Sequence, residues 1–141
     1  MINEFVRDEH KDSWELVEDI PLTAMADSKL EIVMLHKKNE LWDGIPGEEM
    51  RKRAKKGRVN LGQWDAEFLI AHHKIPESLF RLHFVFPGTL WRNPDGELMV
   101  PWLSYGYDFM NMPSQPWDWY LSFDKLDKVW GGDSRFFRLS K

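Results

Sequence analysis

The stretch Phe80–Leu103, FRLHFVFPGTLWRNPDGELMVPWL, predicts the centre of a β-sheet. Large apolar side chains recur at every second position from Phe80 to Phe86, which is typical of a strand with one buried face. Pro87-Gly88 should end this strand, because proline lacks a hydrogen-bond donor and glycine accepts unusual backbone angles. Asn93-Pro94-Asp95-Gly96 then suits a type I turn that closes a hairpin between the next two strands.

Further strands are predicted on the C-terminal side of this stretch. Pro101 lies inside the third strand of the stretch, and a proline there favours an edge strand or a bulge. Residues 117–123 alternate again, with tryptophans at Trp117 and Trp119 on one face. Residues 136–139 can add a short last strand, so the C-terminal half predicts a meander of about four strands.

The N-terminal half predicts two strands and two helices. Residues 14–20 and 29–36 each favour a short strand. Residues 46–56 favour a helix with acidic side chains in its first turn and basic ones in its last, followed by Gly57 at the position of a C-terminal cap. Residues 62–73 favour a second helix. Pro76 follows shortly after, at a position that suits the end of this helix.

These elements predict an α+β fold, with a small, mainly antiparallel sheet and about two helices packed on one face. The length of 141 residues is typical of a single domain, which we expect to span residues 1–141. Within it, residues 1–13 are expected to form a flexible arm, residues 14–58 two strands and a basic helix, and residues 60–141 a helix and the meander.

The composition excludes several kinds of site. The chain has eight tryptophans and no cysteine, which excludes disulfides, thiol nucleophiles and thiolate metal sites. The adjacent His72 and His73 cannot form a metal pair on one helix face, so no metal and no cofactor is expected. No apolar run is long enough to span a membrane, and the acidic N-terminus does not resemble a signal peptide, so we expect a cytoplasmic protein without membrane contact.

Residues 60–141 carry a spaced pattern of turn and core residues. Its positions are Ile75-Pro76-Glu77, Phe86, Gly88-Thr89, Arg92, Pro94-Asp95-Gly96, Val100, Leu103, Trp119 and Trp130. The pattern resembles a loose family of small uncharacterised bacterial proteins that share IPE, F-x-GT-x-x-R, P-x-G and V-x-x-L followed by spaced tryptophans. The resemblance implies a shared fold. It implies no catalytic residue, because the family has no assigned activity.

The charge of the chain is unevenly placed. The net charge is −4, yet residues 51–60 carry six bases and no acid, whereas residues 1–50 carry 13 acids and 5 bases. The bases of this run are Arg51, Lys52, Arg53, Lys55, Lys56 and Arg58. A basic helix in an acidic protein can bind phosphates or an acidic partner. Alternatively, the bases lie on a solvated helix face and neutralise the acids of residues 1–50.

The loop of residues 104–116 is the second predicted contact site. It is long and carries aromatic and methionine side chains. Long apolar loops on a rigid sheet often bind partners. Its candidate contact residues are Tyr105, Tyr107, Phe109, Met110 and Met112.

Two classes of function follow from these features. The first is a non-enzymatic interaction module, a regulator or an inhibitor, that binds a protein or nucleic-acid partner through the basic helix and the aromatic loop. The alternative is a small hydrolase or nuclease in which His83 acts with Asp108 or Asp118, and Arg92 clamps the substrate. A pocket that brings these groups together would favour the enzyme.

Overall fold

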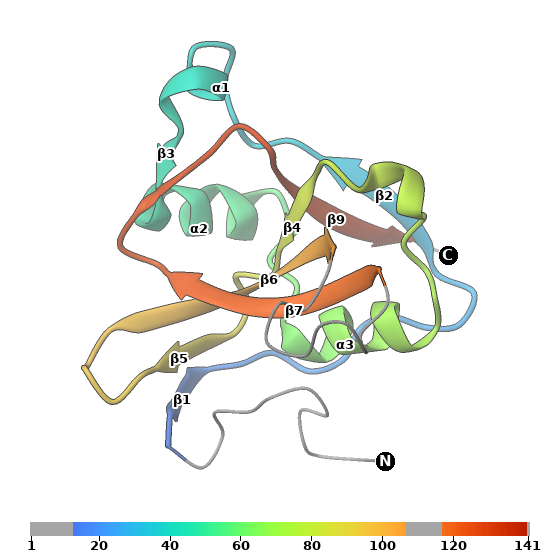
Figure 1. Ribbon diagram of the computed structural model, residues 1–141, viewed down its shortest axis with the longest axis horizontal. Coiled ribbons are helices and arrows are strands. Elements are labelled where there is room, and N and C mark those ends of the chain that lie inside the picture. Colours follow the sequence, from blue (N-terminus) through green and yellow to red (C-terminus); the bar gives the residue numbers. More distant parts are fainter. Residues whose placement is uncertain (1–12, 107–116, 141) are drawn as a thin grey trace.

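The computed structural model describes residues 13–106 and 117–140 of the chain (Figure 1). In chain order, the elements are β1 Glu15–Glu18, β2 Lys29–Val33, α1 Glu40–Asp43, β3 Ile45–Pro46, α2 Gly47–Lys56, α3 Gln63–Ala71, a 3-10 turn Glu77–Leu79, β4 His83–Val85, β5 Leu90–Arg92, β6 Leu98–Gly106, β7 Asp118–Lys125, β8 Val129–Trp130 and β9 Ser134–Ser140. The predicted arm of residues 1–13 lies outside the described residues except for Ser13.

The longest strand, β6, organises the main sheet. It pairs with β7 along one side, from Met99 opposite Lys125 to Gly106 opposite Asp118. On its other side it pairs with β5 near its start and with β4 further along. β5 pairs onward with β1, whereas β4 pairs in parallel with β9, which pairs with β2. The sheet therefore forks where residues 87–89 separate β4 from β5.

The predicted α+β class is confirmed, and the sheet is larger than expected. It has seven strands, because β1 and β2 of the N-terminal half join five strands of the C-terminal half, and β3 and β8 form a separate two-stranded sheet. The predicted turn is present: the Asn93 side-chain oxygen accepts from the backbone N–H groups of Asp95 at 3.0 Å and Glu97 at 2.9 Å. Gly96 has a positive φ of 84°, which suits glycine.

The expectation that Pro101 marks an edge strand or a bulge in its own strand is wrong. Pro101 lies in β6, which is paired on both sides, and it pairs in register with Phe123 of β7. The Pro101 carbonyl accepts from the Phe86 N–H at 3.0 Å, so the proline nitrogen faces the same side of the strand. That side faces the interruption between β4 and β5. The missing donor of Pro101 is tolerated because the neighbouring strand is broken there.

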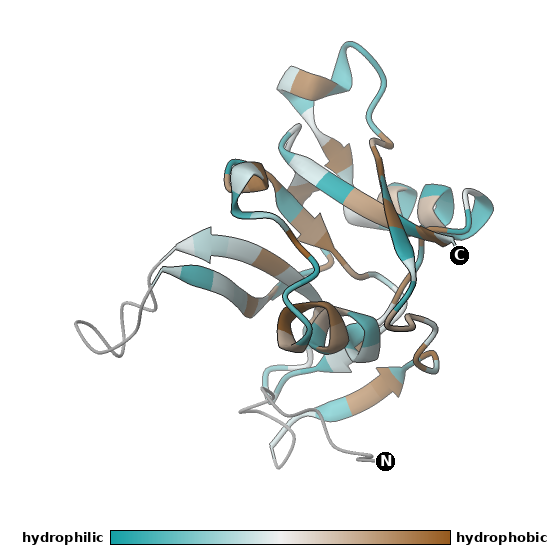
Figure 2. Ribbon diagram, turned by 90° about the vertical axis from the view of Figure 1, so that its right-hand side faces the viewer, coloured by the Kyte–Doolittle hydropathy of each residue, from teal (hydrophilic) through white to brown (hydrophobic). Residues whose placement is uncertain are grey.

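The two long helices cover opposite faces of the central strands. Phe84 and Phe137 pack in one core cluster with α3, whereas their chain neighbours Val85 and Phe136 pack in a second cluster with α2. Neighbouring residues of a strand point to opposite faces, so each helix has a face of its own rather than sharing one. Figure 2 shows that the strands carry both hydrophobic and hydrophilic residues.

Thr89 ties the fork in the sheet to the start of α3. Its hydroxyl accepts the Gln63 backbone N–H at 2.8 Å and donates to Asp19 at 2.7 Å. The helix has no capping side chain of its own at Gly62, so Thr89 supplies the missing acceptor from a distant part of the chain. Gly88 approaches the same region, because its N–H donates to the Leu61 carbonyl at 2.8 Å.

A buried carboxylate fastens the segment before β2 to the same helix. Asp65, fully buried in α3, accepts from the backbone N–H groups of Thr23 at 2.9 Å and Ala24 at 2.6 Å. It also accepts from the Thr23 hydroxyl at 2.7 Å. Such charge-assisted bonds stabilise a buried carboxylate that would otherwise be costly to desolvate.

None of the helices within the described ranges is both long and apolar enough to cross a membrane.

The Thr89 hydroxyl is expected to be essential for stability. Thr89→Val keeps the shape of the side chain but leaves the buried Gln63 N–H without an acceptor, which should lower the free energy of unfolding by about 1–3 kcal/mol. Urea unfolding followed by circular dichroism measures this loss. Thr89→Ser keeps the hydroxyl and should lose about 1 kcal/mol or less. Equal losses in the two variants would show that the hydroxyl does not support the helix.

Candidate functional site

Two of the six bases predicted on α2 are neutralised by acids of the same chain. Arg51 forms an ion pair with Glu18 at 2.5 Å. Arg53 forms ion pairs with Glu40 at 2.6 Å and with Glu49 at 2.8 Å, and both arginines are partly buried. For these two residues the intramolecular alternative is correct: their charges hold the fold together.

The other four bases face solvent. A helix turns by roughly 100° per residue, which places Lys52, Lys55 and Lys56 opposite the buried Met50 and Ala54. Arg58 follows the helix, and all four side chains are exposed with no ion pair within the described residues. We refer to Lys52, Lys55, Lys56 and Arg58 as the basic face.

Arg138 adds a further base at the C-terminal end of α2. It donates to the Gly57 carbonyl at 3.0 Å and to the Glu31 carboxylate at 3.0 Å. Arg135 is held elsewhere, with bonds to the carbonyls of Gly132 and Ser134. The structure thus brings one base of β9 next to the basic face.

An exposed tryptophan lies on α1, next to the basic helix. The Trp42 side chain is 94% exposed, and Leu41 at 39% and Val129 at 58% are also exposed large hydrophobic residues. A β-carbon on Gly44 would meet Val129, so the end of α1 lies against β8. Figure 1 shows α1 projecting from the rest of the protein. We refer to Leu41, Trp42 and Val129 as the α1 anchor.

The α1 anchor is held in place by Glu40. The Glu40 carboxylate accepts from both terminal nitrogens of Arg53, at 2.6 and 2.9 Å, and from the Lys37 backbone N–H at 2.7 Å. The hydrogen bonds from Arg53 and then from Lys37 lower the pKa of Glu40 from 4.5 to about 2. The same pair raises the pKa of Arg53. This bidentate contact connects α1 to α2.

The predicted aromatic loop is largely outside the described residues. Tyr107, Phe109, Met110 and Met112 belong to that part of the chain. Tyr105 is the penultimate residue of β6. Its hydroxyl donates to Glu77 at 2.9 Å, and its ring packs edge-on against Trp119, with ring centroids 5.4 Å apart. The bond to Glu77 raises the pKa of the Tyr105 hydroxyl. Tyr105 packs with the α3 core and not with α2, so the structure does not join it to the basic face.

The structure places neither Asp118 nor Arg92 beside His83. His83 lies beside Asp133, with the Nδ1 to Oδ2 distance at 3.3 Å. Asp118 lies opposite Gly106 in β7, two strands away from β4, and Arg92 pairs with Glu15 on the β5–β1 branch. Asp108 lies outside the described residues. The sequence did not indicate Asp133, because this residue lies in a turn whose path the sequence does not reveal.

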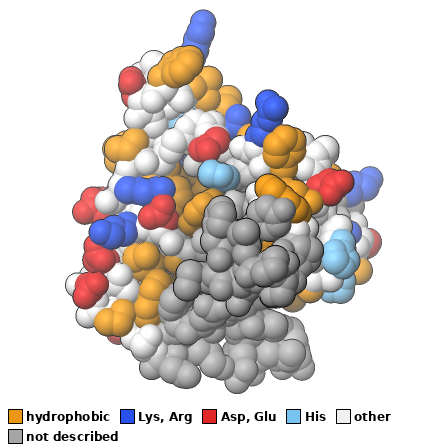
Figure 3. Space-filling view, in the orientation of Figure 1, with side chains coloured by type: hydrophobic (Ala, Val, Ile, Leu, Met, Phe, Trp, Pro, Cys, Tyr) orange, Lys and Arg blue, Asp and Glu red, His pale blue; other side chains and the backbone are white. Residues whose placement is uncertain are grey.

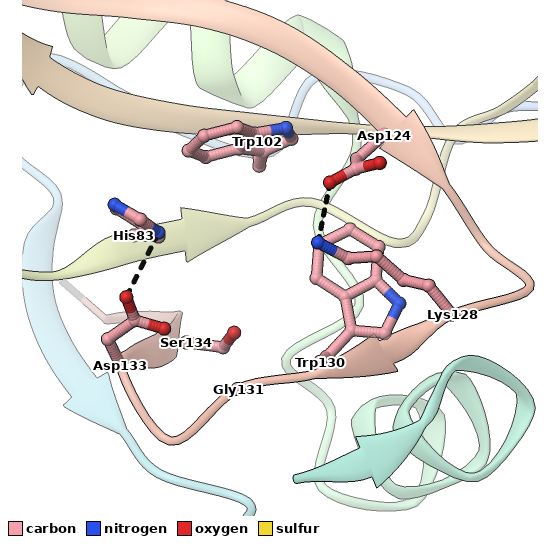
Figure 4. A pocket seen from close by; sticks show the side chains of 8 residues that line it. All are labelled: His83, Trp102, Asp124, Lys128, Trp130, Gly131, Asp133 and Ser134. Atoms are coloured by element: carbon pink, nitrogen blue, oxygen red, sulfur yellow. Dashed lines mark hydrogen bonds and ion pairs between the residues drawn. The ribbon is translucent and has the colours of Figure 1, made fainter.

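His83 nevertheless lines a small pocket of about 120 Å³ (Figure 4). Its wall residues are His83, Trp102, Asp124, Lys128, Trp130, Gly131, Asp133 and Ser134. Lys128 bonds to Asp124 at 2.5 Å and lies over the Trp130 ring, 4.3 Å from its centroid. The His83 ring lies against Trp102, with centroids 4.8 Å apart.

One donor in the pocket wall has no partner. The Trp102 Nε1 is buried and forms no hydrogen bond. In the part of the chain that the structure describes, no three histidine or acidic side chains are grouped closely enough to hold a metal ion. The pocket is therefore lined by two acid–base pairs and two indole rings.

No family model, no curated protein and no solved structure matches the chain. The resemblance to a family of small bacterial proteins therefore stays a prediction. Function has to be argued from the geometry of the sites.

Sequence reasoning missed Trp42, Lys128 and Asp133. The segment around Trp42 reads as a turn or loop, because it contains Pro46 and two glycines. Lys128 and Asp133 flank the glycine pair of residues 131–132, which is a turn signal without functional meaning by itself. A lone tryptophan among charged residues, as in ELWD, was the one available indication of an exposed aromatic side chain.

Replacing Glu40 with Gln should change the pH dependence of stability. The folded-state pKa of Glu40 is lowered to about 2, so its stabilising contribution is present above pH 4.5 and is lost as the pH falls toward about 2. We expect Glu40→Gln to be less stable than the wild type at neutral pH, and the two urea midpoints to converge in acid. Glu48→Gln, an exposed glutamate of α2, is the control and should stay near the wild type. A constant difference at all pH values would contradict the role of the Glu40 charge.

Proposed function

We propose that the protein is a non-enzymatic binding module that attaches to a protein partner through the α1 anchor and the basic face. The observation that carries this proposal is the 94% exposure of Trp42 on a short helix fixed by the Glu40–Arg53 pair. A large, rigidly presented aromatic side chain is typical of an interface hot spot.

The neighbouring charges support an acidic partner. Lys52, Lys55 and Lys56 remain exposed on α2, while Glu18, Glu40 and Glu49 are bonded to Arg51 and Arg53. On the face shown in Figure 3, acidic and basic side chains are interspersed. The clustering of lysines on α2 is therefore not general to the surface. Charges at the rim of an interface mainly speed association and select partners, which suits the arrangement around Trp42.

The backbone at Arg58 supports a binding role for the basic face. Arg58 has a φ of 58°, in the left-handed region where glycine or asparagine is favoured after a helix. An arginine there is a local strain of the kind that is often retained at functional positions. The result is an exposed guanidinium at the end of the three-lysine face.

A protein partner is favoured over nucleic acid by the side chains of the α1 anchor. The exposed apolar side chains nearby are aliphatic as well as aromatic, with Leu41 and Val129 beside Trp42. Aliphatic side chains bury well against protein and offer no stacking surface for bases.

The enzymatic alternative has less support. The acid beside His83 is Asp133, and in Figure 4 the His83 nitrogen that is not bonded to Asp133 points away from Ser134, the nearest hydroxyl in the view. A nucleophile needs a base within hydrogen-bond reach.

The proposal can be tested by fluorescence anisotropy. The probes are a labelled glutamate-rich peptide with a leucine-rich centre and a labelled single-stranded RNA of equal length. We expect the peptide to bind, with an affinity that falls as salt rises. Trp42→Ala should weaken peptide binding by about 10-fold or more, and Lys55→Glu should reduce it through charge. Both sites are exposed, so stability should change by less than about 0.5 kcal/mol.

Matched control variants test whether a loss of peptide binding is specific to the α1 anchor and the basic face. Trp117→Ala removes another exposed tryptophan, and Lys29→Glu reverses another exposed lysine, and both should bind the peptide like the wild type. Tighter binding of RNA, with no effect of Trp42→Ala, would replace the protein partner with nucleic acid. Absence of binding by either probe at low salt would overturn the proposal.

A further inference from the structure

We propose that two copies of this chain associate through the free edge of β2, with the two β2 strands antiparallel and related by a twofold axis at Ile32. This pairing would join the two main sheets into one continuous sheet. The edge of β2 is a different surface from the α1 anchor and the basic face. The inference therefore goes beyond the binding module and does not rest on it.

The free side of β2 presents unpaired backbone groups. β2 ends the sheet beside β9 and, among the described residues, pairs with no other strand (Figure 1). The Asp133 carbonyl accepts the His83 N–H of β4, and the backbone groups of a strand point alternately to its two sides. The even-numbered residues of β9 therefore face β2, where they pair with odd-numbered residues. The N–H and C=O groups of Leu30 and Ile32 are left pointing outward.

β2 is less protected against pairing with another chain than the edge strand β1. β1 has a register shift after Leu16, and such an irregularity blunts an edge. The five pairs of β2 with β9 are consecutive and have no shift. Ile32 in β2 is 41% exposed and Met34, just after it, is 46% exposed, although both are large and apolar. A regular edge with exposed apolar side chains is suited to strand pairing.

The residues around Ile32 are complementary to a second copy of themselves. With Ile32 opposite Ile32 of the second copy, Leu30 lies opposite Met34 and continues the same apolar row. On the other face of the strand, Glu31 lies opposite Val33, so its charge meets no other charge directly. Apolar pairs directly opposite each other are the units that stabilise a sheet.

Charged side chains flank the strand at equal distances from Ile32. Asp27 precedes Ile32 by five residues and Lys37 follows it by five, and both are exposed. Antiparallel pairing about Ile32 brings Asp27 of each copy toward Lys37 of the other, which places opposite charges at both ends. Moving the axis by one residue would place Glu31 opposite itself, or Lys29 opposite Lys37. Like charges directly opposite each other destabilise a sheet, so the axis at Ile32 is favoured.

A second copy is favoured over an extended peptide because β2 is already ordered. A flexible peptide loses conformational entropy at every residue that it fixes in a strand, whereas β9 holds β2 extended before association. A preorganised strand avoids this cost. β2 has only five residues, which makes the interface small, so we expect a weak and reversible dimer.

The proposal can be tested by sedimentation velocity of the full chain from about 10 µM to about 1 mM. We expect a reversible dimer with a dissociation constant of roughly 10 µM to 1 mM. Ile32→Lys places two lysines at the axis and should weaken association by at least about 10-fold. Val17→Lys makes a matched change on β1, where Val17 is 38% exposed, and should associate like the wild type. A monomer at every concentration, or a dimer that Ile32→Lys does not weaken, would overturn the proposal.

Amide hydrogen exchange identifies the strand that pairs and needs no variant. The N–H groups of Leu30 and Ile32 should exchange rapidly in dilute protein and several-fold more slowly at the concentration where the dimer forms. Those of Glu31 and Val33 face β9 and should be protected at both concentrations. A dimer that leaves Leu30 and Ile32 unprotected would show that another surface associates.

Charge reversals outside the strand test the register. Asp27→Lys and Lys37→Glu each place like charges at both ends of the interface, and each variant alone should associate roughly 3- to 10-fold more weakly than the wild type. In an equimolar mixture of the two variants, the charges at both ends become opposite. A mixed dimer should therefore form with about the wild-type affinity, and high salt should reduce these differences. Failure of the mixture to associate better than either variant would contradict the axis at Ile32.

Discussion

The interruption of strand pairing at residues 87–89 is the constraint on which the rest of the structure depends. β6 is continuous, but its neighbour on one side is split into β4 and β5, and each part recruits a different branch of the sheet. The interruption also accommodates Pro101 and places the Thr89 hydroxyl at the start of α3. Phe84 and Val85, next to the fork, then face α3 and α2 respectively. One short irregularity thus sets the sheet branching, the helix cap and the separation of the two cores.

The acids of the N-terminal half are used selectively. Glu18 and Glu40 neutralise Arg51 and Arg53, which lie on the flanks of α2, and leave the outward lysines unpaired. An arginine is suited to the flanks because its planar guanidinium binds a carboxylate through two nitrogens, as Arg53 does with Glu40. Lysine has a flexible, strongly hydrated charge, which suits an exposed face. The division between structural arginines and exposed lysines explains how one helix can stabilise the fold and still present a basic surface.

The sequence predicted much of the fold because its signals were local. The alternation of Phe84 and Phe86, the turn at Asn93 and the capping charges of α2 each act within a few residues, and each predicted element is present. The failures concern contacts between distant segments. Pro101 was placed at an edge because the break in the neighbouring strand cannot be read from the residues around the proline. Asp133 was not identified as a neighbour of His83, because β9 joins β4 in parallel and brings Asp133 to it from 50 positions away.

The α1 anchor and the pocket are separated by one thin layer of backbone. A β-carbon on Gly132 would overlap the Leu41 backbone of α1, and the preceding Gly131 lines the pocket. His36 also bonds to the Trp130 carbonyl at 2.9 Å, which ties the chain before α1 to the pocket wall. Glycine is required in this layer because a side chain would push α1 away from β8. The same short connection between β8 and β9 therefore supports the helix with the exposed tryptophan on one side and borders the pocket on the other.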